Sequence, residues 1–181
     1  MRPHLRQWLV IIMVSVVAGC STAPTIPTVA TVDLTRFMGD WYVIASIPTV
    51  FEKEAFNAIE NYRLNEDGTV ETTFRFNKGG FDGPEKIYRS KAYVLDQTNA
   101  HWGMQFVWPF KAEYRVIYLT EDYSRTMIGR SKRDYIWIMA RDRSIPDDEY
   151  ERLLDLLETY GYDRHKVLKV PQQPPGTSAA G

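Results

Sequence analysis

The 181-residue sequence has one cysteine, three histidines and no excess of positive charge, and each shortage argues against a class of function. Cys20 alone cannot form an intrachain disulfide or a Cys-x-x-Cys metal or redox site. His4, His101 and His165 are far apart in sequence, which argues against a multi-histidine metal site. Lys and Arg number 22 against 23 Asp and Glu, so we expect no nucleic-acid partner. We therefore expect no metal, no cofactor and no catalytic centre.

An uncharged, largely apolar run at residues 8–17 is too short to span a bilayer and follows a basic start, as in a signal peptide. It ends in Val17-Ala18-Gly19-Cys20, which resembles the lipobox of bacterial lipoproteins. The alternative is an ordinary secretory signal with a chance cysteine. The resemblance implies a lipoprotein signal peptide over residues 1–19 and lipidation at Cys20. Ser21, rather than Asp, implies an outer-membrane destination.

The two ends of the chain lack periodicity and are expected to lie outside the folded domain. Residues 20–32 carry the lipidated cysteine and a Pro/Thr-rich stretch that is typical of a tether. Residues 171–181, PQQPPGTSAAG, are typical of a disordered tail. The domain itself is expected over residues 33–170.

Between these ends, short β-rich segments separated by turn residues predict eight strands. They are residues 41–47, 56–64, 69–76, 87–95, 102–108, 114–119, 126–129 and 135–140. A helical turn at residues 34–38 precedes them and a short strand at residues 167–170 follows. Eight strands in sequence-adjacent hairpins favour an up-and-down barrel or a sandwich.

One amphipathic helix follows the eighth predicted strand. Ser144 is expected to cap it, with Pro146 in its first turn and Gly161 after its end. Its apolar residues fall at positions i, i+3, i+4 and i+7: Tyr150, Leu153, Leu154 and Leu157. A small closed barrel has no room for a helix inside, so this stripe should pack on the outside of the sheet.

Three sequence blocks, in order, resemble those of the lipocalin family. Gly39-Asp40-Trp41 resembles the G-x-W signature, residues 119–123 resemble the second block, and residues 134–141 resemble the third, which ends in Arg141. With the lipobox in front, the chain resembles a bacterial lipocalin, an outer-membrane lipoprotein that binds fatty acids and phospholipids. The resemblance implies an all-β fold: an eight-stranded up-and-down antiparallel β-barrel with one C-terminal α-helix packed outside.

The resemblance also sets which side chains should point into the barrel. Gly39, Trp41 and Arg141 are expected to form its floor, with Arg141 packed on Trp41. Alternation along each strand then predicts a ligand cavity lined by aromatic, Met and small residues. These are Val43, Ala45, Tyr62, Phe74, Phe76, Tyr88, Met104, Phe106, Trp108, Tyr114, Val116, Tyr118, Trp137 and Met139. Glu60 falls at an inward position too, where a satisfied pair, a phase error or a ligand headgroup would explain it.

The expected function is the binding, storage or transport of a fatty acid or lysophospholipid at the outer membrane, in membrane biogenesis or repair. The loops at residues 49–56, 77–86, 109–112 and 131–134 should frame the mouth. Their mixture of Lys, Arg, Asp and Glu favours a zwitterionic head over a purely anionic one. The basic cluster Arg130, Lys132 and Arg133 is available there for a phosphate group. The alternative is a structural barrel with a filled core that recruits a partner. We expect a lipid-anchored protein facing the periplasm, with a homodimer as one open arrangement.

Overall fold

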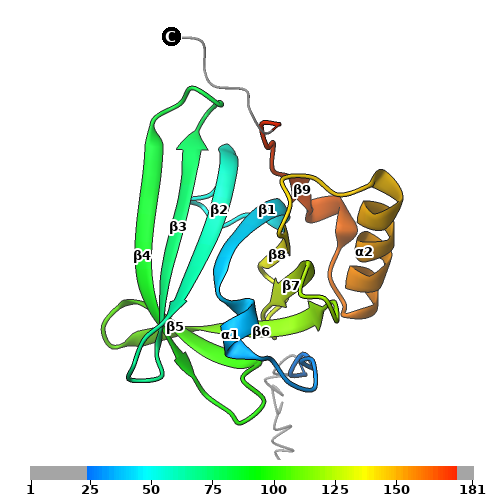
Figure 1. Cartoon of the computed structure of the whole chain (residues 1–181). Coiled ribbons are helices and arrows are strands. Elements are labelled where there is room, and N and C mark those ends of the chain that lie inside the picture. The colour runs from blue at the N-terminus through cyan, green and yellow to red at the C-terminus, as the bar shows by residue number, and fades with distance from the viewer. Residues whose placement is uncertain (1–23, 175–181) are drawn as a thin grey trace, which may run out of the picture.

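Nine antiparallel strands form one sheet, and eight of them close into a barrel (Figure 1). The computed structural model describes residues 24–174. The barrel closes because β1 pairs with β2 along one edge and with β8 along the other. The strands are β1 (Gly39–Ile47), β2 (Ala55–Leu64), β3 (Val70–Lys78), β4 (Glu85–Val94), β5 (His101–Val107), β6 (Phe110–Leu119), β7 (Arg125–Gly129), β8 (Ile136–Ala140) and β9 (Leu168–Lys169). The predicted eight-stranded barrel is therefore confirmed.

Period-two alternation of apolar residues, the signal that predicted the strands, matches burial in the structure. In β3, Val70, Thr72, Phe74 and Phe76 are buried while the residues between them keep partial exposure. The predicted strand ends are close to the observed ones, except that β6 begins at Phe110 instead of residue 114. The extra residues of β6 pair with the end of β5, as in the contact between Val107 and Phe110, and make a long hairpin.

A β-bulge in β1 reverses the alternation that we used to assign inward positions. Val43 lies opposite Met139, and Ala45 lies opposite Ile138, so Ile44 is the extra residue. Ala45 consequently packs with Ile138 in the cluster beneath the outer helix. The prediction that Ala45 lines the cavity is wrong for this reason.

A second bulge, in the pairing of β6 with β7, has the same effect on Tyr118. Val116 lies opposite Ile128, and Tyr118 lies opposite Met127, which leaves Ile117 as the extra residue. Tyr118 belongs to the outer cluster, and its hydroxyl accepts a hydrogen bond from Arg152 at 3.3 Å. The prediction that Tyr118 lines the cavity is therefore wrong as well.

Helix α2 (Asp147–Thr159) covers one flank of the barrel, next to β7, β8 and β9 (Figure 1). Its predicted apolar stripe is the buried face. Ser144 does not cap it: the helix begins after Pro146, without a side-chain cap. Three acidic residues in the first turn, Asp147, Asp148 and Glu149, lie near the positive end of the helix dipole instead. The helix ends at Tyr160, just before Gly161.

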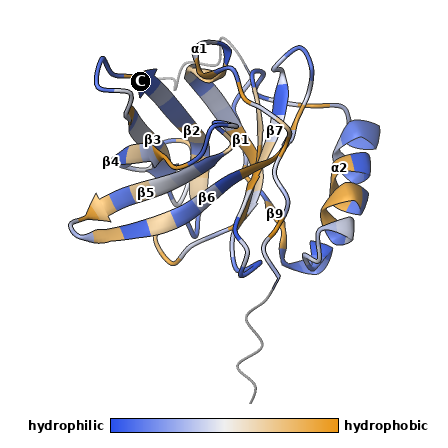
Figure 2. Ribbon diagram, turned by 90° about the horizontal axis from the view of Figure 1, so that it is seen from below, coloured by the Kyte–Doolittle hydropathy of each residue, from blue (hydrophilic) through white to orange (hydrophobic). Residues whose placement is uncertain are grey.

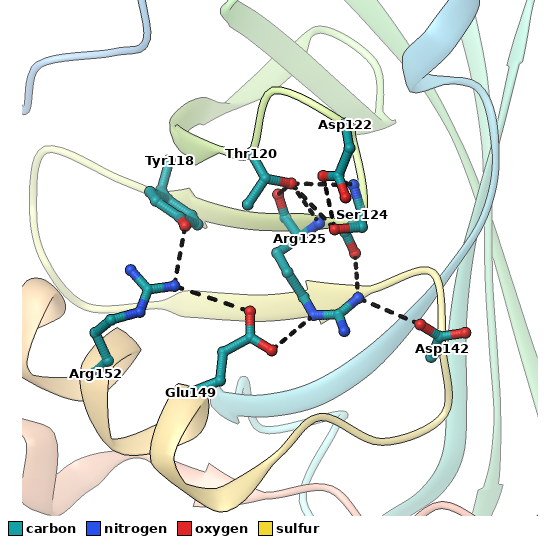
Figure 3. Close-up of polar contacts among 8 residues, drawn as sticks. All are labelled: Tyr118, Thr120, Asp122, Ser124, Arg125, Asp142, Glu149 and Arg152. Atoms are coloured by element: carbon teal, nitrogen blue, oxygen red, sulfur yellow. Dashed lines mark hydrogen bonds and ion pairs between the residues drawn. The ribbon is translucent and has the colours of Figure 1, made fainter.

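Polar contacts fix the start of α2 to the turn between β6 and β7 (Figure 3). Arg125 contacts Glu149 of the helix at 3.3 Å and Asp142 at 3.4 Å. The Thr120 hydroxyl accepts the backbone N–H groups of Ser124 and Arg125, each at 3.0 Å, which shapes the turn itself. The second sequence block, residues 119–123, thus belongs to a turn that positions the helix.

The N-terminal stretch that we assigned to a tether packs on the barrel where it is described. The Val32 backbone N–H donates to Thr98 at 2.8 Å, and Ile26 donates to the Ser131 hydroxyl at 3.2 Å. Ile26 and Val32 are fully buried. Residues 24–32 therefore run from α1 (Leu34–Phe37) up to the loop between β7 and β8. The signal peptide and Cys20 lie outside the described residues.

The start of the predicted C-terminal tail is also hydrogen-bonded to the barrel. After the 3-10 helix Arg164–Lys166 and β9, the Gln172 side chain donates to the carbonyls of Val43 and Ala58, each at 2.9 Å. Asn57 donates its backbone N–H to Pro171 at 2.8 Å. These bonds bridge the upper parts of β1 and β2, where the two strands have separated. The prediction of disorder is wrong for residues 171–173, and residues 175–181 lie outside the described part.

Candidate ligand-binding site

The floor of the barrel is built by Trp41 and Arg141, as predicted. The Arg141 guanidinium carbon lies 3.8 Å from the centre of the fully buried Trp41 ring. Arg141 also donates four hydrogen bonds, of 2.7–3.0 Å, to the backbone carbonyls of Arg36, Phe37, Met38 and Asp40. Gly39 has φ +92°, a conformation that favours glycine, and an added Cβ would lie 3.5 Å from Arg141. This arrangement seals the end of the barrel beside α1.

Above this floor, aromatic rings pack against one another and carry two buried hydroxyls. The ring of Tyr114 stacks on that of Trp102 with centroids 5.2 Å apart. The hydroxyls of Tyr62 and Tyr114 hydrogen-bond to each other. Burial raises the pKa of both tyrosines well above the usual value, so both stay neutral. The bottom of the barrel interior is thus largely apolar, with this hydroxyl pair and the buried hydroxyl of Thr72 as polar groups.

A cavity of about 600 Å³ occupies the rest of the barrel interior. Eight of the predicted residues line it: Tyr62, Phe74, Tyr88, Met104, Phe106, Tyr114, Trp137 and Met139. Val43, Phe76 and Val116 lie in the inner hydrophobic cluster without lining the cavity. The size falls within the range of pockets that hold one small organic ligand.

The lid between β1 and β2 contributes residues that strand alternation was unable to identify. Thr49, Val50, Phe51 and Glu52 all line the cavity. Val50 and Phe51 are also among the most exposed apolar residues, so the cavity opens at this end. The sequence placed residues 49–56 at the mouth, but no pattern in this loop shows which of its side chains turn into the cavity.

Three carboxyl groups, those of Glu52, Glu60 and Glu113, lie in this largely apolar lining, and the pKa values of the first two are raised. Burial, together with the charge of Glu52, raises the pKa of Glu60 to about 8. Burial also raises the pKa of Glu52, while hydrogen bonds from Thr49 and the Trp137 side chain act in the opposite direction. The Thr49 backbone N–H donates to Glu52 at 3.0 Å. The inward placement of Glu60 from strand phase is confirmed.

The rim of the open end exposes a group of large apolar side chains. The hairpin of β5 and β6 reaches away from the α2 side of the barrel, with hydrophobic residues at the end of β5 (Figure 2). We call this group the apolar rim: Val50, Phe51, Phe106, Val107, Trp108 and Phe110. Trp108 is 81% exposed and does not line the cavity, because it lies in the turn after β5. Its predicted place in the cavity is therefore wrong.

In the basic cluster near the mouth, Arg130 and Arg133 form hydrogen bonds or ion pairs with other residues of the protein. Arg133 donates to the Tyr160 carbonyl at 3.1 Å and also hydrogen-bonds to Pro24 and Ser131. Arg130 lines the cavity but pairs with Asp134 at 3.4 Å. The structure therefore does not support a free phosphate site made by Arg130 and Arg133.

The described residues lack two features that would point to other functions. Residues 24–174 contain no group of three or more His, Cys, Asp or Glu side chains placed to hold a metal ion. No helix within the same residues is long and apolar enough to cross a membrane. What the described residues do offer is an enclosed apolar volume with a few polar groups, which suits binding of a small apolar or amphiphilic molecule.

A closed eight-stranded barrel with one sealed end and a central cavity is the architecture of a small-ligand binding protein. Residues 32–172 match the model of the lipocalin-like domain, so the chain belongs to the lipocalin family. It is 32% identical to the outer membrane lipoprotein Blc of Escherichia coli K12, covering 86% of this chain and 90% of that protein. It is 31% identical to temperature-induced lipocalin-1 of Arabidopsis thaliana, covering 80% and 83%. Among solved structures, insecticyanin from the tobacco hornworm Manduca sexta aligns with a TM-score of 0.66 at 15% identity, covering 87% of this chain and 90% of that one.

Proposed function

We propose that the protein binds a single-chain amphiphilic lipid, a fatty acid or lysophospholipid, and stores or carries it beside the outer membrane of a bacterial cell. The observation that supports this proposal best is the apolar cavity of about 600 Å³, open at one end. A barrel with a filled core, the structural alternative, would have no such space. A narrow eight-stranded barrel accommodates one acyl chain more readily than two.

Burial energies make the proposal quantitatively reasonable. Each methylene removed from water contributes about 0.8 kcal/mol, so twelve methylenes contribute about 10 kcal/mol before costs. Association costs several kcal/mol or more, which leaves room for micromolar or tighter binding. The likeness to outer membrane lipoproteins supports the proposed location. Exchange of lipid with a nearby membrane, in its biogenesis or repair, is the role we infer.

Tryptophan fluorescence tests the binding proposal directly. Trp137 lines the cavity, whereas Trp41 is fully buried in the floor and Trp102 is fully buried in the aromatic layer above it. We expect saturable quenching with lysophospholipid or fatty acid at low micromolar concentration or below. A Trp137→Phe variant should lose most of this signal yet still show bound lipid by native mass spectrometry. A folded, empty protein with neither a saturable response nor a mass shift would favour the structural alternative.

The anchoring part of the proposal rests on Cys20 and has its own prediction. Cys20→Ser should move the protein from the membrane to the soluble fraction and leave thermal unfolding unchanged. Pro24, four residues further on, accepts a hydrogen bond from Arg133 in the loop between β7 and β8. Because two or three acyl chains anchor firmly and one chain only marginally, loss of the thiol should release most of the protein. A variant that stays on membranes after a high-salt wash would require a second anchor.

A further inference from the structure

Glu60 is a carboxyl group of the cavity lining that no described residue satisfies. It sits in the middle of β2, opposite Trp41 on one side and Phe74 on the other, and it lines the cavity. Residues 24–174 supply neither a hydrogen bond nor an ion pair to its carboxyl group. Its accessible surface faces the cavity. A buried carboxyl without a partner is costly, so its presence requires either a proton or a ligand that satisfies it.

The nearby ionisable groups do not supply that partner. Glu52, on the lid, is acidic itself and raises the Glu60 pKa. Tyr62 and Tyr114, on β2 and β6, are neutral, share a hydrogen bond, and have their own pKa values raised further by Glu60. These neighbours therefore supply no positive charge to Glu60.

The basic residues of the lining, Arg89 and Arg130, make no ion pair or hydrogen bond with Glu60. Arg130 pairs with Asp134 at 3.4 Å, and Arg89 is an exposed residue of β4. Arg141 lies below the cavity, where it donates to backbone carbonyls. Glu113, the third carboxyl of the lining, is matched by Arg115 at 2.5 Å and by the Ser131 hydroxyl at 2.8 Å. Glu60 therefore differs from Glu113 in having no cation of its own.

We propose that Glu60 recognises a protonated amine carried by an otherwise apolar ligand, with the amine held inside the barrel. The inference rests on the proposed lipid-binding function and specifies its ligand class. A carboxylate pairs with an ammonium group through a charge-assisted hydrogen bond. The rings of Tyr62, Tyr114 and Trp137 add faces that attract a cation. Once Glu60 is ionised, a carboxylate headgroup at the same place would be repelled by it.

The effect of Glu60 ionisation on the stability of the folded protein also favours a cationic ligand. Because its pKa is raised in the folded state, Glu60 makes the empty protein less stable as the pH rises from the usual glutamate range towards about 8. An ammonium group beside the carboxylate would offset that loss. An alkanol would not offset it, because it brings no charge.

Three ligands of equal chain length test the proposal: dodecylamine, dodecanol and dodecanoate. Each displaces the neutral fluorescent probe N-phenyl-1-naphthylamine from the full-length protein at about pH 9, where Glu60 is ionised and the amine is still protonated. We expect dodecylamine to bind at least tenfold more tightly than the other two. Glu60→Gln should reduce this preference to threefold or less and leave dodecanol binding unchanged or stronger. Glu113→Gln, a carboxyl of the same cavity that is already paired, should keep the preference.

Each other outcome has a defined meaning. Equal binding of the three ligands by the wild type, or an amine preference that survives Glu60→Gln, would overturn the role of Glu60 and leave lipid binding intact. Failure of the probe and of every ligand to bind would instead contradict the proposed function. Thermal unfolding of Glu60→Gln checks the fold, and we expect it to occur at the wild-type temperature or above, because the substitution removes an unpaired acid.

Discussion

Trp41→Ala should lower the free energy of unfolding by about 3–5 kcal/mol, the usual cost of removing a buried large aromatic side chain. The indole is fully buried, and its N–H donates to the Phe37 carbonyl at 2.8 Å. Its loss leaves a void between α1 and the barrel and removes the surface on which Arg141 rests. Urea or thermal denaturation, followed by circular dichroism, measures the effect.

Arg141→Ala should cost about 2–4 kcal/mol, because it leaves buried carbonyls at the floor without a donor. The two residues are in contact, so their effects should not add. We expect the double variant to be about 1 kcal/mol or more less destabilised than the sum of the single variants. Arg141→Lys is the matched control: it keeps the charge but loses most of the four hydrogen bonds, so it should recover only part of the stability. Strict additivity would show that the ring and the guanidinium do not act together.

Sequence patterns predicted the architecture well because the interior of a barrel imposes strict alternation. β3 shows this in its buried residues at every second position. The helix was predictable because its four apolar residues form one stripe that needs a partner surface. The floor was predictable only through the resemblance, because nothing in local periodicity brings Arg141 to Trp41, a hundred positions earlier.

The predicted cavity lining differs from the observed one for two physical reasons. Bulges at Ile44 and Ile117 shift the phase of one strand, and no residue type marks either position. Ala45 and Tyr118 therefore turn outward although their pattern is uninterrupted. Loops have no period at all, so the lid residues Val50 and Glu52 were not identified as part of the lining.

Glu60 shows what the structure adds to the sequence pattern. Phase alone placed its side chain inward, where a salt bridge, a phase error or a ligand contact would each have been consistent. The arrangement of its neighbours separates these alternatives: the phase is correct, and the described residues provide no cation. A polar residue that contradicts its apolar surroundings is thus more informative about ligand chemistry than the aromatic residues that agree with them.

Ala112→Trp should abolish high-affinity lipid binding while the barrel stays folded. Ala112 lies on β6 opposite Met104, and both residues line the cavity. An indole at this position would occupy space that an acyl chain needs. If it excludes four methylenes, the lost burial is about 3 kcal/mol, which corresponds to a decrease in affinity of about a hundredfold or more. Because the ring enters an existing void, the overpacking that destabilises filled cores should be small.

Titration of lysophospholipid, followed by native mass spectrometry, measures the loss without relying on the added tryptophan. Ala112→Ser is the matched control, because it changes the same position with almost no change in volume and should bind lipid nearly as well as the wild type. Thermal unfolding of both variants should stay close to the wild-type temperature. Wild-type affinity in a folded Ala112→Trp protein would place the lipid outside this cavity. The apolar rim, with Phe106 and Trp108 at its exposed tip, would then be the next surface to test.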